Sequence, residues 1–416
     1  MPLFSPVDLD TRAHDIMAER HARPPLPVGT PALCQQMIFR RQDVNSAFCT
    51  EGWRAFFDRA GLDAPLISAE SVFAESDALS MKWEHHTEFV SLTTVHRVTG
   101  ADANAITEAP PLDSGAPVFH AVVIGVELST QPRLSESPLF AWADTAAVRT
   151  SQVLDGSATI ASDFAFDANG CVRILVSAEQ DDPHRLGRLV QRLIEIESYS
   201  TLSLLAWDTV TATGPLLQKV DDDLKALVTQ IPDSDRMSDQ AVLSQLEHLA
   251  AIHETNVADA NFRLSASLAY FDIVEDRLVE LNETVLTGSQ SFRNFIRRRG
   301  VPAAKTYTHI LNRQEKISER LNRATQLLRS RVDVALASQN QLQLEAMNKR
   351  AEAQYRLQKT VEGLSAIAIS YYALGLLSYL ATSIDVSLAE PVLKANIGYL
   401  TPLVVVVVWL GLRRLH

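Results

Sequence analysis

The sequence GLSAIAISYYALGLLSYLAT occupies residues 363–382, and none of its twenty side chains carries a charge. A second uncharged stretch, ANIGYLTPLVVVVVWLGL, occupies residues 395–412. About 20 helical residues are needed to cross ~30 Å of hydrocarbon, so each stretch predicts a transmembrane helix. The short linker at 383–394 would make the pair an antiparallel hairpin. The alternative is a buried hairpin in a soluble core, but the valine run at 404–408 forms helix poorly in water.

Charges around the two stretches predict their orientation. Basic side chains precede the first stretch and follow the second: Lys349, Arg350, Arg356, Lys359, Arg413 and Arg414. The linker holds Lys394 beside Asp385 and Glu390. Cytoplasmic loops carry an excess of Lys and Arg, so we expect both ends in the cytoplasm and the linker outside. The prediction is a multi-pass protein of the inner (plasma) membrane.

Small residues in the first stretch suggest a packing face between helices. Ala366 and Ser370 are four positions apart, and Gly375 extends the same face. This face favours a homo-oligomer in the membrane. Neither stretch contains an ionisable side chain, which counts against a secondary transporter with a charged pathway.

Composition narrows the remaining classes. The chain is 46% hydrophobic and 21% charged with a net charge of −12, so it can build a core but lacks the basic balance of a nucleic-acid-binding protein. Its three cysteines form no CxxC pair, which argues against a zinc knuckle or a disulfide framework. Residues 1–23 show no apolar signal-peptide core, and no GxxxxGK[ST], GxGxxG or GxSxG motif occurs. Whether the protein uses a cofactor stays unknown from the sequence.

Helical periodicity dominates the region before the membrane stretches. Apolar residues recur every three or four positions over 258–299, with Gly288 filling one step, and the Gly-Val-Pro at 300–302 is expected to break this helix. A second helix would run from about residue 305 through the first membrane stretch, the alternative being two helices broken at Gly363. Such a seam is typical of a coiled coil.

The region before residue 180 reads as mixed α/β. Residues 46–61 predict a helix, and residues 78–97, 118–128, 147–154, 157–166 and 171–178 predict strands. Pro183 would begin an amphipathic helix over 184–205. The fold class expected is an α+β cytosolic domain followed by a long helical stalk and a C-terminal hairpin. The expected divisions are an α/β domain (1–180), a helical connector (181–257), a long helical hairpin or stalk (258–362), the first span (363–382), an external loop (383–394), the second span (395–412) and a cytoplasmic tail (413–416).

Three groups of residues are candidate ligand sites. His21 and Arg23 precede two prolines that hold the arginine in an extended backbone, where it could grip an anion or staple the segment to a neighbouring acid. Glu84, His86 and Glu88 would share one strand face, as a metal site, an acid–base pair, or a polar network with Arg23 or Arg97. Arg192 belongs to an arginine stripe with Arg185 and Arg188, either an anion site or a salt-bridged helix face. No catalytic residue is assigned, and the metal question stays open.

Several segments together resemble a known family. They are HARP (21–24), KWEHHTEF (82–89), RLIEIESY (192–199), RR (298–299), PA (302–303), LLRSRVDV (327–334), QN (339–340), LQKTVEGLS (357–365) and ISYY (369–372). They resemble the bacterial domain-of-unknown-function family 3422, over about residues 12–414. The resemblance implies a membrane-anchored bacterial protein, and this family has no established activity.

The order of elements is also similar to that of the CorA magnesium channels. Those channels have a Gly-Met-Asn loop between their spans, whereas this chain reads Ser-Ile-Asp-Val-Ser over 383–387. The leading hypothesis is therefore a non-enzymatic, oligomeric, membrane-anchored scaffold or sensor facing cytoplasmic partners. The alternative is a divalent-cation transporter that lacks the Gly-Met-Asn loop, and a third possibility is an enzyme using Glu84, His86, Glu88 and Arg23.

Overall fold

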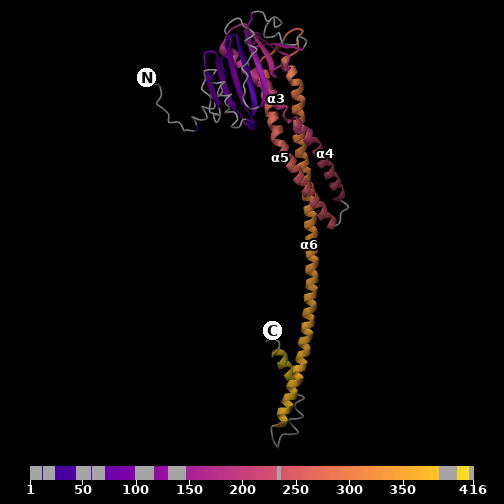
Figure 1. The fold of residues 1–416 in the computed structure, drawn as a ribbon. Helices are drawn as coiled ribbons and strands as arrows, with labels where there is room; N and C mark the ends of the chain where they lie inside the picture. Colours follow the sequence, from indigo (N-terminus) through magenta and orange to yellow (C-terminus); the bar gives the residue numbers. More distant parts are fainter. Residues whose placement is uncertain are drawn as a thin grey trace, which may run out of the picture. The chain divides into compact units, whose positions relative to one another are not determined.

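The computed structural model describes residues 12, 24–43, 58, 71–98, 117–129, 147–231, 236–383 and 401–411 (Figure 1). The chain divides into two compact units. The first comprises Met1–Ala226 and Glu247–Asn322, and the second comprises Leu227–Leu246 and Arg323–His416. Apart from residue 58, the helix expected at 46–61 lies outside the described residues.

A mixed β-sheet forms the centre of the first unit. Its strands, within the described ranges, are β1 (Ala32–Arg40), β2 (Ser71–Glu75), β3 (Leu79–His85), β4 (Phe89–Arg97), β5 (Val118–Leu128), β6 (Arg149–Val153), β7 (Ala158–Ser162), β8 (Val172–Ala178) and β9 (Thr284–Val285). The sheet order is β2-β3-β4-β1-β5-β8-β7-β6-β9. Every pairing is antiparallel except the one between β5 and β8.

The sequence predictions for the strands are mostly confirmed, with one correction. Strands β5 to β8 lie within the predicted ranges, and the turn after β6 holds Asp155 and Gly156 at positive φ. The stretch at 78–97, however, is a hairpin, because β3 ends at His85 and β4 begins at Phe89. His86 and Glu88 therefore lie in the turn, outside the strand face that both were predicted to share with Glu84.

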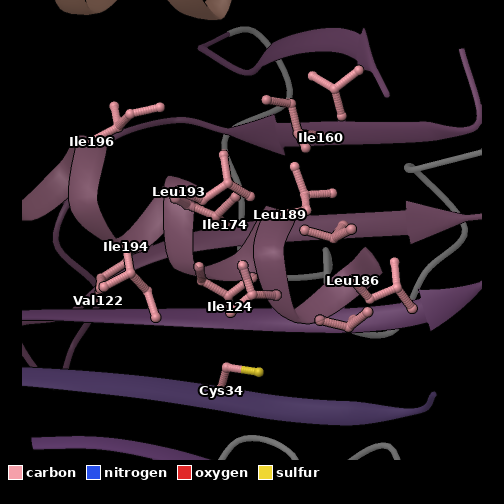
Figure 2. Close-up of a cluster of buried hydrophobic side chains, with 14 of the residues drawn as sticks. Cys34, Val122, Ile124, Ile160, Ile174, Leu186, Leu189, Leu193, Ile194 and Ile196 are labelled. Carbon is pink, nitrogen blue, oxygen red and sulfur yellow. The ribbon is translucent and has the colours of Figure 1, made fainter. Parts of the chain in front are cut away.

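Helix α3 (Pro183–Ser203) covers one face of the sheet. It begins as predicted at Pro183, and the Asp182 side chain caps it by accepting a hydrogen bond from the Arg185 backbone N–H at 3.0 Å. Leu186, Leu189 and Leu193 of α3 lie against apolar side chains of β5, β7 and β8 (Figure 2). This buried cluster is the main core of the unit and fixes α3 on the sheet, because burial of each such side chain is worth about 2 kcal/mol.

Three further helices follow α3: α4 (Ala206–Gln230), α5 (Arg236–Glu280) and α6 (Phe292–Ser383). Within the first unit, His253 of α5 lies 3.0 Å from the Gln314 carbonyl and 2.9 Å from the Ser318 hydroxyl of α6. Arg313 of α6 donates to Gln218 of α4 at 2.6 Å. These contacts pack the three helices side by side, and α5 runs through the connector–stalk boundary expected at residue 258.

The expected helix break at 300–302 is wrong. Residues 300–302 lie inside α6, whereas the chain turns between Glu280 and Phe292. Asn282 and Gly288 have φ values of 50° and 85° there, which helical residues do not adopt. Gly288 is therefore part of a turn and not a step in a helical seam, and α6 begins thirteen residues earlier than expected at 305.

Capping explains where α6 starts. The Glu283 carboxylate accepts hydrogen bonds from the backbone N–H groups of Phe292 at 2.8 Å and Arg293 at 3.0 Å. The Ser291 hydroxyl accepts another from Asn294 N–H at 3.0 Å. These side chains satisfy backbone donors that a helix start leaves unpaired.

The second unit contains the remainder of α6. The helix continues without interruption through Gly363, as expected, to Ser383. By its length and composition, it is long and apolar enough to cross a membrane. The second predicted span is described only over Thr401–Gly411, a shorter apolar helix of about 16 Å, so the two-helix hairpin is a prediction that the described residues do not test.

Candidate functional site

A cavity of about 160 Å³ lies between α3 and the β3, β4 and β1 region of the sheet. Its walls come from the segment before β1, from three strands and from α3. The strand register explains its polar floor, because Lys82, Thr93 and Gln36 are directly paired across β3, β4 and β1. Glu84 and Ser91 form the next row. Alternation along β3 sends Met81 and Trp83 into a separate apolar cluster on the opposite face.

A buried ion pair is the main charged feature of the cavity. Lys82 Nζ lies 3.2 Å from Glu84 Oε2, and the two side chains are only 7% and 8% exposed. Lys82 also lies 3.5 Å from the Pro24 carbonyl oxygen. Removing two charges from water costs several kcal/mol per ion, which their mutual attraction only partly offsets. Such a pair therefore suits a site where a polar ligand completes the interactions.

Hydrogen bonds hold the neutral polar side chains in place. Gln36 donates to the Thr93 hydroxyl at 3.3 Å and accepts from the Ser198 hydroxyl of α3 at 2.5 Å. His86 stacks on Phe89 with ring centroids 4.1 Å apart, and its Nε2 lies 3.4 Å from the Ser91 hydroxyl. These contacts fall into separate sets, and each of them restricts the orientation of the polar side chains that it joins.

Helix α3 supplies the opposite wall of the cavity. Glu195 accepts a hydrogen bond from Gln191 at 2.8 Å and another from Arg277 of α5. Val190 and Ile194 add apolar surface beside them. The strand side of the cavity is therefore polar, whereas the α3 side is partly polar and partly apolar. The two acidic side chains, Glu84 and Glu195, each have a basic partner.

The chain before β1 closes one end of the cavity. Leu26 and Val28 line it, and Val28 N–H donates to the Pro183 carbonyl at 2.9 Å. A Cβ on Gly187 would fall well inside van der Waals contact of the Leu26 carbonyl oxygen. Only a glycine lets this segment lie so close to α3.

Glu88 does not belong to this cavity. Its carboxylate accepts two hydrogen bonds of 2.7 Å from Arg263 and a third from the Tyr270 hydroxyl, both on α5. Of the three acidic and histidine candidates, the structure therefore brings Glu84 and His86 together and leaves Glu88 apart. Arg97, one predicted partner of this network, pairs instead with Glu75 at 2.7 Å.

The remaining predicted ligand residues lie elsewhere. Arg192 donates to Glu280 at 2.8 Å on the helical surface, and it does not line the cavity. Arg185, from the same stripe, donates to the Leu154 carbonyl at 3.1 Å. His21 and Arg23 lie outside the described residues. Within the described ranges, no group of three or more His, Cys, Asp or Glu side chains is placed to hold a metal ion.

A family model described as "Protein of unknown function (DUF3422)" matches residues 10–416. The chain belongs to this family. No curated protein matches it. The match covers nearly the whole chain and includes the residues that form the sheet, the cavity and α6.

The DUF3422 chain also buries a titratable pair that the sequence does not reveal. His120 of β5 and Glu197 of α3 approach to 3.9 Å between Nε2 and Oε1. Burial raises the pKa of Glu197 to about 7 and lowers the pKa of His120 to about 4. Both shifts favour the uncharged forms, because a low dielectric penalises charge. His120 is paired across β1 with Ile38, in the same sheet row as Glu84 and Ser91.

The three residues predicted to pack within the membrane all lie on α6. Ala366 and Ser370 are buried, and the Ser370 hydroxyl donates to the Ala366 carbonyl at 2.6 Å. A Cβ atom at Gly375 would contact no neighbouring side chain or backbone among the described residues. The Ala366 and Ser370 face of the DUF3422 helix is therefore covered, whereas most neighbouring apolar side chains are exposed.

Proposed function

We propose that this DUF3422 chain is a membrane-anchored scaffold or sensor, which displays its α+β domain and the α3 cavity to the cytoplasm. The observation that carries the proposal is the exposure of α6. Its apolar 18-residue window is only 11% buried, whereas the core helix of a soluble protein would be mostly buried. The exposed side chains of this segment are Leu364, Ile367, Ile369, Tyr371, Tyr372, Leu376, Leu377, Tyr379 and Leu380.

The free-energy cost of exposing these apolar side chains to water supports the proposal that lipid surrounds this segment of α6. Soluble monomers rarely leave contiguous apolar patches above a few hundred Å² in water. A helix crossing ~30 Å of hydrocarbon satisfies its backbone internally and needs such a surface all round. The flanking basic residues support a cytoplasmic location for both ends and an external location for the linker at 383–394.

A homo-oligomer is part of the proposal. Exposed apolar side chains continue along α6 before the membrane segment, at Leu336, Leu342, Leu344, Met347 and Leu357. The earlier apolar residues of α6 are already buried within the chain: Ile310, Ile317, Leu321 and Leu328. The later, exposed stretch is therefore the part of the helix that we propose contacts another copy. Cross-linking in native membranes is expected to give discrete multimers, and recovery of monomers alone would reject this part.

Topology provides the experiment for the anchor itself. A cysteine placed by Asp385→Cys is expected to react with a membrane-impermeant maleimide added to intact cells. The unaltered chain, with its three cysteines at 34, 49 and 171, is the control and should stay unlabelled in intact cells. Labelling of the Asp385→Cys variant only after permeabilisation would overturn the proposed orientation.

The second candidate is a divalent-cation transporter of CorA-like architecture. The feature that favours it is the continuity of α6 over 92 residues, from the α+β domain into the apolar segment. Asp385 and Glu390 would then lie at the external mouth. Metal uptake into liposomes, lost in an Asp385→Asn, Glu390→Gln variant, is the expected result for this candidate. Absence of uptake by the unaltered chain would dispose of it.

A further inference from the structure

We propose that the cavity between α3 and the sheet binds a small zwitterion of the α-amino-acid type. The ligand's carboxylate would lie toward Lys82, its ammonium group toward Glu84, and its apolar side chain toward α3. This inference deepens the sensor role proposed above and rests on it for its biological meaning. Its physical basis is the cavity alone.

Charge balance selects the ligand class. Lys82 and Glu84 are both buried and lie 3.2 Å apart, so the floor of the cavity carries one positive and one negative charge side by side. A free anion attracted by Lys82 would also be repelled by Glu84, and a free cation attracted by Glu84 would also be repelled by Lys82, so the pair favours neither single charge. A zwitterion instead presents both signs in the reverse order, so its charges would alternate with those of two side chains that are themselves largely buried.

Unfilled hydrogen-bonding capacity points the same way. An ammonium group has three donors, and the contacts of Lys82 among the described residues are Glu84 at 3.2 Å and Pro24 O at 3.5 Å. The longer contact lies at the limit of a hydrogen bond. A ligand carboxylate would provide a shorter, charge-assisted acceptor.

Size and wall chemistry narrow the ligand further. At about 160 Å³ the cavity is smaller than the ~300 Å³ at which sites for drug-sized ligands begin. Its apolar lining consists of Leu26, Val28, Phe89, Val95, Val190 and Ile194. A small aliphatic side chain would fill this part, whereas a nucleotide or a peptide would not fit.

Calorimetric titration of the full-length protein in detergent micelles tests the inference. The probes are L-alanine, L-valine and L-leucine, with two analogues of valine that each lack one charge: isovalerate, without the amino group, and isobutylamine, without the carboxylate. We expect saturable binding of at least one amino acid and at least tenfold weaker binding of both analogues. This comparison needs no variant and therefore does not depend on refolding a mutant.

A matched pair of double variants locates the site. Lys82→Met with Glu84→Gln should weaken amino-acid binding at least tenfold. Glu75→Gln with Arg97→Met removes an exposed ion pair of the same sheet and should leave binding unchanged. Binding of no amino acid, or equal binding of isovalerate or isobutylamine, would overturn the inference. Because the titration is made in micelles, its failure is independent of the outcome of the topology experiment.

Discussion

The guanidinium group of Arg263, on α5, donates two hydrogen bonds of 2.7 Å to the carboxylate of Glu88, in the turn between β3 and β4. The two residues are 175 positions apart in the sequence. Their side chains are 15% exposed for Glu88 and 21% for Arg263. The pair fixes the tip of the β3–β4 hairpin, and so one end of the cavity, to the helical part of the first unit.

Glu88→Gln should therefore lower the free energy of unfolding by about 2 kcal/mol, because it leaves the Arg263 charge without its carboxylate partner. Chemical denaturation in micelles measures the change. Glu75→Gln is the control, since its pair with Arg97 is about 42% exposed and should be worth under ~1 kcal/mol. Equal effects of the two substitutions would contradict the role given to Glu88.

Gly187→Ala should destabilise the protein by about 1–3 kcal/mol, even though alanine is the better helix former. The new Cβ would collide with the Leu26 carbonyl and displace the segment that closes the cavity. Arg188→Ala, an exposed neighbour on the same helix, is the control and should be nearly neutral. The thermal midpoints of both variants provide the comparison, and an unchanged midpoint for Gly187→Ala would show that the segment does not pack as described.

His120 and Glu197 should have opposite effects on how the free energy of unfolding changes with pH. The folded chain keeps the Glu197 proton up to about pH 7, whereas the unfolded chain releases it near 4.5, so this residue lowers stability as pH rises between these values. His120 becomes protonated below about pH 6.5 in the unfolded chain and only near pH 4 in the folded chain. This residue therefore increases stability as pH rises from about 4 to 6.5. The two effects should largely cancel between pH 4.5 and 6.5.

Removing one partner should expose the effect of the other. In Glu197→Gln, the free energy of unfolding should rise with pH between about 4 and 6.5, by up to ~1.4 kcal/mol per pH unit. In His120→Gln, it should fall between about 4.5 and 7. Unfolding titrations at several pH values test both slopes, and slopes of the same sign would refute the assignment.

Glu283→Gln should weaken the start of α6 by about 1 kcal/mol, because an amide cannot accept from both the Phe292 and Arg293 N–H groups as the carboxylate does. The negative charge near the helix start is lost as well. Glu179→Gln, an exposed acid after β8, should have no measurable effect. Hydrogen exchange at the first turn of α6 reports the change directly, and unaltered protection there would contradict the capping role.

The sequence predicts the regular elements better than their connections. The turn at Asp155 and Gly156, the start of α3 at Pro183 and the passage of α6 through Gly363 could all be predicted from local signals. Pro302 misled the prediction because the packing of α6 outweighs the lost backbone hydrogen bond. Strand β1 has no alternating pattern to reveal it, since Gln36 faces the cavity and Met37 faces the other side, and both are buried.

Only some residues of the candidate site could be predicted from the sequence. Alternation along β3 places Glu84 opposite Trp83, as expected. Glu88 lies outside the cavity because a turn begins after His85, and the sequence did not reveal the position of that turn. Its partner Arg263 is too distant in the sequence to be inferred. Lys82 had a usable signal, because it lies two positions before Glu84 on a strand and must share its face. His120 and Glu197 had none, since only the fold brings them together.

Carbonate extraction of native membranes tests the central claim most directly. The unaltered protein should stay in the membrane pellet, whereas Ile367→Lys with Leu376→Lys should shift a measurable fraction into the supernatant, because each charge in a span costs about 3 kcal/mol. Leu336→Lys with Leu344→Lys, which changes exposed residues of α6 before the span, should remain in the pellet. Release of the unaltered chain into the soluble fraction would contradict the account of α6 as a membrane anchor.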